Sequence, residues 1–343
     1  MAVRKFLLGL AVGATLIGAE VLAADHAATD AATLAAALKA ANGGDRVFAA
    51  PGEYGALTLV SRQFSPAVTI SAADMLSPPM FSSITLHDVS GLNLTNVKVE
   101  FGAANAPLTT YAVEINRGAD IKISNAEILS AANGVAGDDA YGVFIRNSAG
   151  VRIENSVVHD VYRGVAALAS DDVTIAGNSI TRVGSDGIIA GGVLRMTIAS
   201  NYFADFDIID PKLHHPDAIQ IWSRNSARAN SNVTVRGNLI RRGNGDPSQG
   251  IFVNTPETET AGLLIEENVV EQSMGQGIFV LNAVNAIIRK NTVLPVDYRV
   301  DAPGLEIRSP SRNITVSGNI ASAFRLDAGV NSTGNAIVDY HNP

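Results

Sequence analysis

Hydrophobic and polar positions alternate in short segments along most of the chain. One copy of the pattern runs from Asp186 to Phe206 (DGIIAGGVLRMTIASNYFADF), with an apolar strand at 187–190, a small turn, and a second strand at 196–198 that runs into Asn201. A two-residue period and many β-branched side chains are typical of β-strands. No stretch with helical periodicity interrupts the copies, which excludes helical solenoids and leucine-rich repeats with long helices.

The second half of this pattern recurs as VRIENSVV, VTIAGNSI, MTIASNYF, VTVRGNLI, LLIEENVV, AIIRKNTV and ITVSGNIA. Its asparagines are Asn155, Asn178, Asn201, Asn238, Asn268, Asn291 and Asn319, with looser copies at Asn96 and Asn125. Self-similarity at intervals of about 20–50 residues predicts a solenoid. We expect each coil to bury Val, Ile and Leu against its neighbours, and the asparagines to stack into a ladder that hydrogen-bonds the turn backbone.

The composition fits a single repeat domain. The 343 residues are 47% hydrophobic but only 6% aromatic, and 31 are glycine, so small and β-branched residues are available to fill narrow coils. A net charge of −8 argues against nucleic acid as the main partner. The absence of cysteine excludes disulfides and thiolate metal sites, so the stack itself must supply the stability.

The first 24 residues are predicted to be a signal peptide, which leaves residues 25–343 as the solenoid domain. Arg4 and Lys5 form a basic start, an apolar run follows from Phe6 to Ile17, and VLA at 21–23 is a small-residue cleavage signal. The apolar run is too short for a good membrane span. We therefore expect an exported bacterial protein, periplasmic or secreted, with no membrane span in the mature chain. An uncleaved anchor is the alternative.

A short amphipathic helix is predicted at residues 30–41, with Thr29 or Asp30 as its N-cap and the Asn-Gly-Gly at 42–44 as its end. It is followed by GDRVFAAPGEYGALTLV. A short helix before GD-x-[apolar]-x-x-x-PG-x-Y resembles the N-terminal cap and first coil of the right-handed parallel β-helix superfamily of pectate-lyase type. That superfamily includes polysaccharide lyases, mannuronan C5-epimerases and galacturonan hydrolases. The resemblance implies an all-β, single-stranded right-handed parallel β-helix with a short N-terminal capping helix, but it does not fix the reaction.

Aligning the coils on the residue that opens the first strand predicts columns of stacked side chains. The opening residues are Gly142, Gly164, Gly187, Ala218, Gly250, Gly277 and Gly304, and the residues just before them are Tyr141, Arg163, Asp186, Asp217, Gln249, Gln276 and Pro303. Two residues after the opening residues lie Phe144, Ala166, Ile189, Gln220, Phe252, Phe279 and Glu306. Four residues after the opening residues lie Arg146, Leu168, Gly191, Trp222, Asn254, Leu281 and Arg308. We expect these columns to face outward and to form an extended surface suited to a linear polymer.

The longest interval between repeat asparagines, 37 residues from Asn201 to Asn238, carries an insertion on each side of one strand. Insertions in a solenoid usually form loops on one face, often the binding face. This one holds Asp207, Asp210, His214, His215, Asp217, Gln220 and the single tryptophan, Trp222. It is the leading candidate for the active site. The alternative is a loop without function, in which His215-Pro216-Asp217 fixes a turn.

We predict two groups of site residues around this insertion. The predicted catalytic residues are His214, His215, Asp217, Arg163 and Asp186. The predicted substrate-binding residues are Tyr162, Arg182, Gln220, Trp222, Arg241, Arg242, Gln249 and Phe252. Asp186 and Asp217, about 4.8 Å apart on adjacent coils, would raise one another's pKa unless a cation or an arginine lies between them. No cofactor is certain, and Ca²⁺ at these two aspartates is an open alternative.

The chemistry of these residues favours a carbohydrate-active protein whose partner is a linear acidic polysaccharide. Lyases and epimerases both begin by removing the C5 proton of a uronic acid, which needs positive charge on the carboxylate together with a base and an acid. Arginines can supply the charge, and the histidines or Tyr162 can move the proton. The segment from Asp210 to His214 (DPKLH) loosely resembles the D-P-H motif of mannuronan epimerases.

Two other functions stay open. A non-catalytic carbohydrate-binding or surface protein can use the same fold. An inverting glycoside hydrolase needs two carboxylates about 6.5–9.5 Å apart, wider than one coil spacing. The G-H-G and R-I-K motifs of the galacturonan hydrolases are missing from this chain.

Overall fold

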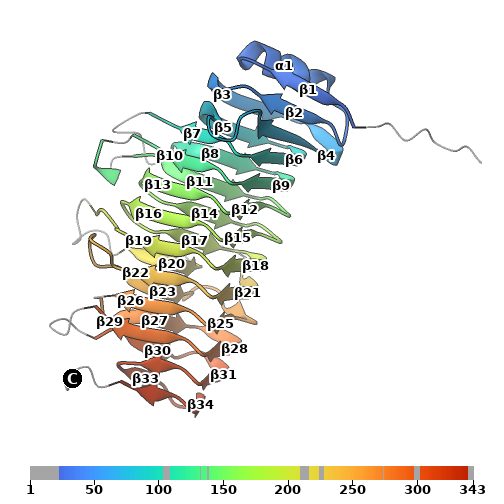
Figure 1. Ribbon diagram of the computed structural model, residues 1–343. Coiled ribbons are helices and arrows are strands. Elements are labelled where there is room, and N and C mark those ends of the chain that lie inside the picture. Colours follow the sequence, from blue (N-terminus) through green and yellow to red (C-terminus); the bar gives the residue numbers. More distant parts are fainter. Residues whose placement is uncertain are drawn as a thin grey trace, which may run out of the picture.

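The computed structural model describes residues 23–102, 109–131, 133–136, 139–208, 216–223, 228–272, 274–296 and 302–338. These residues wind into a right-handed parallel β-helix that runs from β1 at one end to β35 at the other (Figure 1). Each pairing among the described strands is parallel and joins one coil to the next. The predicted fold class is therefore confirmed. The predicted signal peptide, residues 1–24, lies outside the described residues except for its last two, and it stays a prediction.

The coils have three faces, which we call A, B and C. Face A is a 14-stranded sheet. Its strands are β1 (Asp25–Ala28), β2 (Arg46–Ala49), β4 (Gln63–Ala72), β6 (Ser90–Thr95), β9 (Ala119–Ser124), β12 (Arg152–Glu154), β15 (Thr174–Ala176), β18 (Leu194–Ala199), β21 (Asn230–Arg236), β24 (Thr260–Ala261), β25 (Leu264–Glu266), β28 (Ala283–Arg289), β31 (Arg312–Ser317) and β34 (Asn331–Thr333).

Faces B and C are joined at β5, which pairs with β7 and with β8. Face B contains β3 (Gly52–Val60), β5 (Pro79–His87), β8 (Tyr111–Asn116), β11 (Tyr141–Arg146), β14 (Val165–Leu168), β17 (Ile188–Gly191), β20 (Asp217–Trp222), β23 (Gln249–Asn254), β27 (Gln276–Leu281), β30 (Gly304–Arg308) and β33 (Phe324–Leu326). Face C contains β7 (Lys98–Glu100), β10 (Glu127–Leu129), β13 (Val157–Val161), β16 (Ser179–Val183), β19 (Tyr202–Ala204), β22 (Leu239–Arg241), β26 (Val269–Gln272), β29 (Thr292–Pro295), β32 (Ile320–Ala321) and β35 (Ala336–Ile337).

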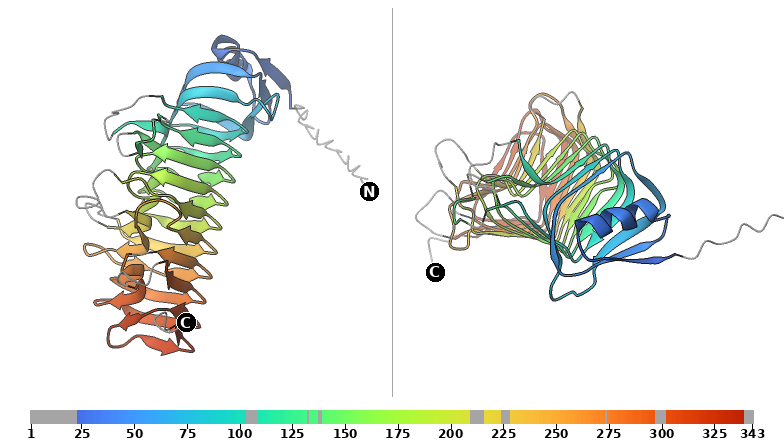
Figure 2. Two further views of the ribbon diagram at one scale, coloured as in Figure 1. Left: turned by 60° about the vertical axis from the view of Figure 1, so that its left-hand side comes forward. Right: turned by 90° about the horizontal axis from the view of Figure 1, so that it is seen from above.

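The hydrophobic core fills the inside of the stack and continues from coil to coil. Alternate strand residues point inward, as in β18, where Met196 and Ile198 are buried while Arg195 and Thr197 face outward. Burying one such side chain contributes about 1.5–3 kcal/mol, and each core residue needs the coils above and below to be buried. The helix α1 (Ala31–Ala40) lies across the N-terminal end of this core (Figure 2).

The capping helix forms as its sequence predicts. The Asp30 carboxylate accepts a hydrogen bond from the Thr33 backbone N–H (2.8 Å), and the Thr33 hydroxyl accepts one from the Asp30 backbone N–H (3.0 Å). This reciprocal capping box fixes the start of the helix. Leu34 and Leu38 are buried and cover the open end of the coils. Among the described residues, no helix has both the length and the apolar character needed to cross a membrane.

The predicted asparagine ladder forms, but three of the asparagines expected in it lie one residue away from the ladder position. Asn178, Asn201, Asn238, Asn268, Asn291, Asn319 and Asn335 are joined by side-chain hydrogen bonds from each coil to the next. Asn155, expected in the ladder, is exposed at a left-handed turn position (φ 50°), and Ser156 takes its place. Asn96 and Asn125 also have left-handed backbone (φ 55° and 52°). The sequence analysis placed these three asparagines one residue out because asparagine suits both positions, and only the coil register separates them.

Replacing one ladder asparagine is expected to destabilise the whole coil stack. In Asn268→Ala, the buried backbone N–H and side-chain amide of Asn238 lose their acceptor, and the Val235 carbonyl loses its donor. Leaving buried polar groups unpaired costs about 1–3 kcal/mol each. We expect the free energy of unfolding to fall by roughly 2–4 kcal/mol, measured by chemical denaturation. Asn254→Ala, a half-buried asparagine outside the ladder, is the control, and an equal loss in both variants would contradict this account.

Candidate functional site

The residues that open the strands of face B line up as the sequence predicts, and steric contact between coils explains why. A Cβ added to Gly164 would lie 2.3 Å from the Gly187 carbonyl oxygen, and one added to Gly187 would lie 2.6 Å from that of Ala218. The glycines therefore let adjacent coils approach closely. Backbone hydrogen bonds then hold the residues just before them in register, from Gly164 N–H to Asp186 C=O (3.1 Å) and from Gly187 N–H to Asp217 C=O (2.9 Å). The predicted column is confirmed from Tyr141 to Gln249, whereas a register shift places Gln276 opposite Gly304 and not opposite Pro303.

Arg163 is the cation of this column. Its Nε lies 3.3 Å from Asp186 Oδ2, and its Nη1 donates to the Tyr141 hydroxyl at 2.5 Å. The guanidinium also packs over two aromatic rings, 5.3 Å from the centre of Tyr141 and 5.2 Å from that of Tyr162. Burial opposes the charged form, but the Asp186 carboxylate and the two tyrosines outweigh it and raise the pKa of Arg163. The Arg163 side chain remains 29% exposed, so part of it is open to solvent.

Asp217 is the buried acid of the column. It is 0% exposed, its backbone N–H donates to Asp186 Oδ1 (3.0 Å), and its Oδ2 accepts from Gln220 Nε2 (2.6 Å). No described residue gives Oδ1 a hydrogen-bond partner. Burial and the nearby Asp186 charge raise the pKa of Asp217 well above its ordinary value, although the Gln220 hydrogen bond opposes them. The protonated form of Asp217 is therefore favoured, while Asp186 is paired with Arg163.

This division of charge bears on the calcium alternative. The raised pKa of Asp217 and the guanidinium of Arg163 beside Asp186 both reduce the repulsion between the two aspartates, so their geometry does not require a cation between them. Within the described part of the chain, no group of three or more histidine, aspartate or glutamate side chains could hold a metal ion. Calcium at Asp186 and Asp217 stays a prediction that the geometry of these two carboxylates does not require.

The Asp217→Asn variant is expected to be more stable than the wild type at neutral pH. The folded protein resists ionisation of Asp217, whereas the unfolded chain ionises near the ordinary value of 3.8. Stability of the wild type therefore falls as pH rises above that value, until the folded pKa is passed. The neutral amide removes this loss, so we expect Tm to rise by a few degrees near pH 7 and the difference to vanish below about pH 3.

A pH series of thermal melts checks this prediction. Asp186→Asn is the matched control, because its amide oxygen can still accept the hydrogen bond from the Asp217 backbone N–H but the ion pair with Arg163 is lost. We expect this control to lower Tm near pH 7. A lower Tm for Asp217→Asn at neutral pH would show that Asp217 is ionised in the folded protein.

A groove of about 580 Å³ lies beside the column, where the strands of face C end. It is lined by Gly134, Asp160, Arg182, Asp205, Phe206, Asp207, Arg242, Asn244, Gly245 and Asp246. Three of its carboxylates accept hydrogen bonds from backbone N–H groups of the loops. Asp205 accepts from Asn244 (2.8 Å), Asp207 from Ala136 (3.1 Å) and Asp246 from Ile208 (3.0 Å). These aspartates therefore shape the groove.

The predicted arginines outside the column are largely bound to the protein itself. Arg182 pairs with Asp160 at 2.7 Å, and Arg241 pairs with Glu271 at 2.8 Å. Burial raises the pKa of Asp160, but the hydrogen bonds from Arg182 and His159 outweigh it and lower that pKa. Arg242 donates to the Gly245 carbonyl (3.1 Å) and lines the groove with Arg182. Arg182 and Arg242 therefore face the groove and not the Asp217 carboxyl.

The remaining predicted residues are buried, half-buried or outside the described residues. Gln220 and Phe252, expected on an open surface, are only 6% and 8% exposed, because Gln220 turns to Asp217 and Phe252 stacks on Phe279 with ring centres 4.8 Å apart. Gln249 is the strand partner of Asp217 on the next coil, as predicted, but it is only 6% exposed and not on an open surface. Trp222 is half-buried between Gly191 and Asn254 in its column. His214, His215 and Asp210 lie outside the described residues.

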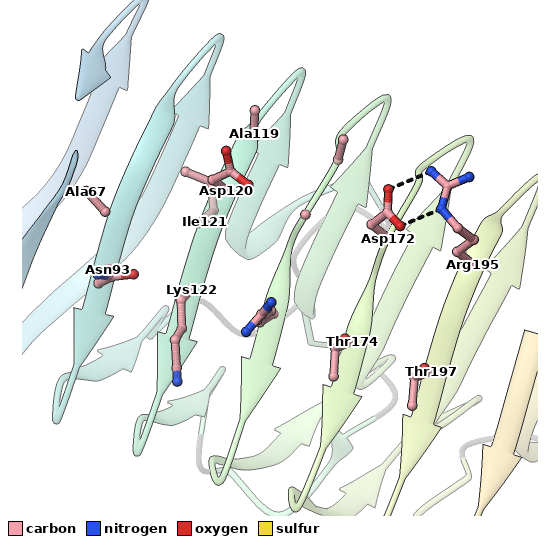
Figure 3. A pocket seen from close by; sticks show the side chains of 13 residues that line it. Ala67, Asn93, Ala119, Asp120, Ile121, Lys122, Asp172, Thr174, Arg195 and Thr197 are labelled. Carbon is pink, nitrogen blue, oxygen red and sulfur yellow. Dashed lines mark hydrogen bonds and ion pairs between the residues drawn. The ribbon is translucent and has the colours of Figure 1, made fainter. Parts of the chain in front are cut away.

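The sequence analysis missed two features. Tyr141 was placed in the column but was not assigned to the site, although its hydroxyl contacts Arg163. A second groove, of about 730 Å³, lies on face A and was not anticipated (Figure 3). Its basic residues Lys122 and Arg152 occupy the outward position of successive strands. The polar residue between the two apolar ones in each repeat was the available signal.

Comparison with known proteins shows the family. The family model described as "Right handed beta helix region" matches residues 82–207 and 111–293, which together span more than half of the chain. The protein therefore belongs to the right-handed β-helix family. No curated protein matches its sequence significantly.

Several solved structures share this fold at low sequence identity. The alginate lyase from Paenibacillus sp. str. FPU-7 is 15% identical with a TM-score of 0.54, over 92% of this chain and 99% of that one. Pectate lyase Pel9A is 13% identical with a TM-score of 0.55, over 92% and 78% of the two chains. PfbA, a surface adhesin of Streptococcus pneumoniae, is 12% identical with a TM-score of 0.56, over 90% and 86%. Identities this low establish the fold alone.

Proposed function

We propose that this protein is an exported enzyme that acts on a linear acidic polysaccharide by removing the C5 proton of a uronic acid, with elimination or epimerisation as the outcome. The observation that carries the proposal is the setting of Arg163. Its charge is maintained by Asp186, its side chain is partly exposed, and the Tyr141 hydroxyl lies 2.5 Å from it. A fixed cation next to a proton-bearing hydroxyl is the pair of groups that this chemistry needs.

Arg163 would bind the carboxylate of the sugar. Neutralising that carboxylate makes the adjacent C5 proton more acidic, because the negative charge that develops on proton removal spreads onto the carboxylate oxygens. Asp186 would hold the guanidinium in place. Asp217, buried and favoured in its protonated form, would fix Asp186 through its backbone N–H.

Tyr141 would act as the acid. Burial raises its pKa, although the Arg163 charge opposes this, so its hydroxyl keeps its proton at neutral pH. In elimination, a base takes the C5 proton, the C4–O bond breaks as the C4–C5 double bond forms, and Tyr141 protonates the departing oxygen. In epimerisation, a proton returns to C5 from the opposite side. His214 and His215 remain the predicted bases.

Two of the fold relatives are named as an alginate lyase and a pectate lyase, while a third is named as a surface adhesin. A polysaccharide substrate agrees with the two lyases, and the sugar and the reaction are left to experiment. The burial of Asp186 and Asp217, at 4% and 0% exposure, disfavours inverting hydrolysis, which needs two carboxyls facing a sugar with room for water between them. Non-catalytic binding is the alternative that the test below separates.

Substitution of Arg163 tests the proposal. Wild-type protein is incubated with alginate, pectate, glucuronan and glycosaminoglycans, and ultraviolet absorbance reports a new C4–C5 double bond while proton exchange at C5 reports epimerisation. We expect one signal on at least one polymer, and a fall in kcat/KM on the order of 10²–10³-fold in Arg163→Ala. Arg163→Lys keeps the charge beside Asp186 but loses the planar fork, so it should fold normally and stay at least about tenfold impaired.

Arg236→Ala is the matched control, because Arg236 is an exposed arginine on face A, away from the Arg163 site, with no carboxylate partner among the described residues. Its activity should equal that of the wild type. Equal activity of folded Arg163→Lys and the wild type would move the site elsewhere. Polymer binding with neither signal, and no new reducing ends, would establish the non-catalytic alternative.

A further inference from the structure

The groove on face A is a second concave surface, separate from the face that carries Arg163 and Asp217. It has a volume of about 730 Å³ and is lined by Ala67, Asn93, Ala119, Asp120, Ile121, Lys122, Ala149, Gly150, Arg152, Asp172, Thr174, Arg195 and Thr197. The small residues at 67, 119, 149 and 150 leave space open in the groove. Gly150 has a left-handed backbone (φ 68°), as do Asp120, Asp172 and Arg195 (φ 51°, 52° and 56°) at the equivalent position of neighbouring coils, and a Cβ added to Gly150 would lie 2.7 Å from Asp120 Oδ1.

One row of the groove repeats once in every coil. Asn93, Lys122, Arg152, Thr174 and Thr197 are direct ladder partners on five successive strands. Figure 3 shows four of them, Asn93, Lys122, Thr174 and Thr197, in a line across the strands. With strands about 4.8 Å apart, the row is about 19 Å long. Each coil thus presents one hydrogen-bonding side chain, at a repeat comparable to the length of one sugar residue in an extended polysaccharide.

The charges along the groove leave one arginine available. Lys122 pairs with Glu154 at 2.8 Å. Arg195 makes two bonds of 2.6 Å to Asp172, drawn as dashed lines in Figure 3. Arg152 is exposed between them and has no carboxylate partner among the described residues.

The same groove lacks a surface for a neutral sugar to stack on. None of the described residues that line it is aromatic. Aromatic faces supply much of the contact area when sugars bind through their apolar sides, so binding here must depend on charge and on hydroxyl contacts. The exposed carboxylate of Asp120 can accept hydrogen bonds from sugar hydroxyls at the edge of the groove. An anionic glycan fits these groups better than a neutral one.

We propose that this groove is a second binding surface for the acidic polysaccharide, along which a stretch of the polymer runs parallel to the axis of the β-helix. Arg152 binds a carboxylate of the polymer, and Asn93, Thr174 and Thr197 contact hydroxyls of neighbouring sugars. The inference rests on the substrate class proposed above. Because faces A and B are different sides of the coil stack, this surface holds polymer without taking part in the reaction.

Binding of polyuronate to the Arg163→Lys protein, which should turn the polymer over more slowly than the wild type, tests the inference. We expect Arg152→Glu to raise the Kd for polyuronate about tenfold or more. Lys122→Ala should raise it less, because the Lys122 charge is already paired. Binding should weaken as salt rises, and a neutral glucan of equal length should bind poorly. Turnover of a short oligouronide by Arg152→Glu, in an otherwise wild-type protein, should be unchanged.

Arg236→Glu is the matched control. Arg236 is an exposed arginine in β21 on the same sheet, it does not line the groove, and it has no carboxylate partner among the described residues. Equal polyuronate affinity in Arg152→Glu and Arg236→Glu would overturn the inference, as would equal affinity for the neutral glucan. Loss of the proposed reaction in every assay, with polyuronate binding that still depends on Arg152, would refute the proposed function and leave this surface standing.

Discussion

The close contact between successive coils is the constraint on which the rest of this structure depends. Glycines that open the strands of face B lie against the backbone of the next coil, where a Cβ would come within 2.3 Å of a carbonyl oxygen at Gly164. Parallel backbone hydrogen bonds and the buried ladder that starts at Asn178 hold the same register on the other side of the coil. The hydrophobic core follows from this register, because each inward side chain is covered by its counterparts above and below.

The same register places two carboxyl groups on adjacent coils, where the repulsion between their charges must be reduced. Asp186 and Asp217 are adjacent because their coils are adjacent, and two buried carboxylates cannot both be ionised at low cost. The structure separates their roles: Asp186 pairs with Arg163, and the pKa of Asp217 is raised by burial and by the Asp186 charge. Arg163 thereby becomes a positioned cation that is still partly exposed, beside a tyrosine hydroxyl.

Two faces of one solenoid thus carry different arrangements of polar groups. On face B the polar column is largely buried and densely hydrogen-bonded, which suits a few groups held in fixed geometry. On face A the outward row is half-buried or exposed and repeats once per coil, which suits contact with an extended polymer. A repeat fold can support both, because each face is a separate set of positions in the same sequence period.

The sequence by itself determined the fold class, the capping helix and the columns, because a two-residue period and a repeated asparagine reflect local geometry that each coil reproduces. It located Arg163, Asp186, Asp217 and Gln249 in one column for the same reason. Only the tertiary structure decided what the column faces. Burial turned Gln220 inward to Asp217 and Phe252 onto Phe279, and ion pairs tied Arg182 and Arg241 to acids on neighbouring coils. Register also decided that Ser156, and not Asn155, joins the ladder, because one residue of shift exchanges a buried position for an exposed left-handed turn.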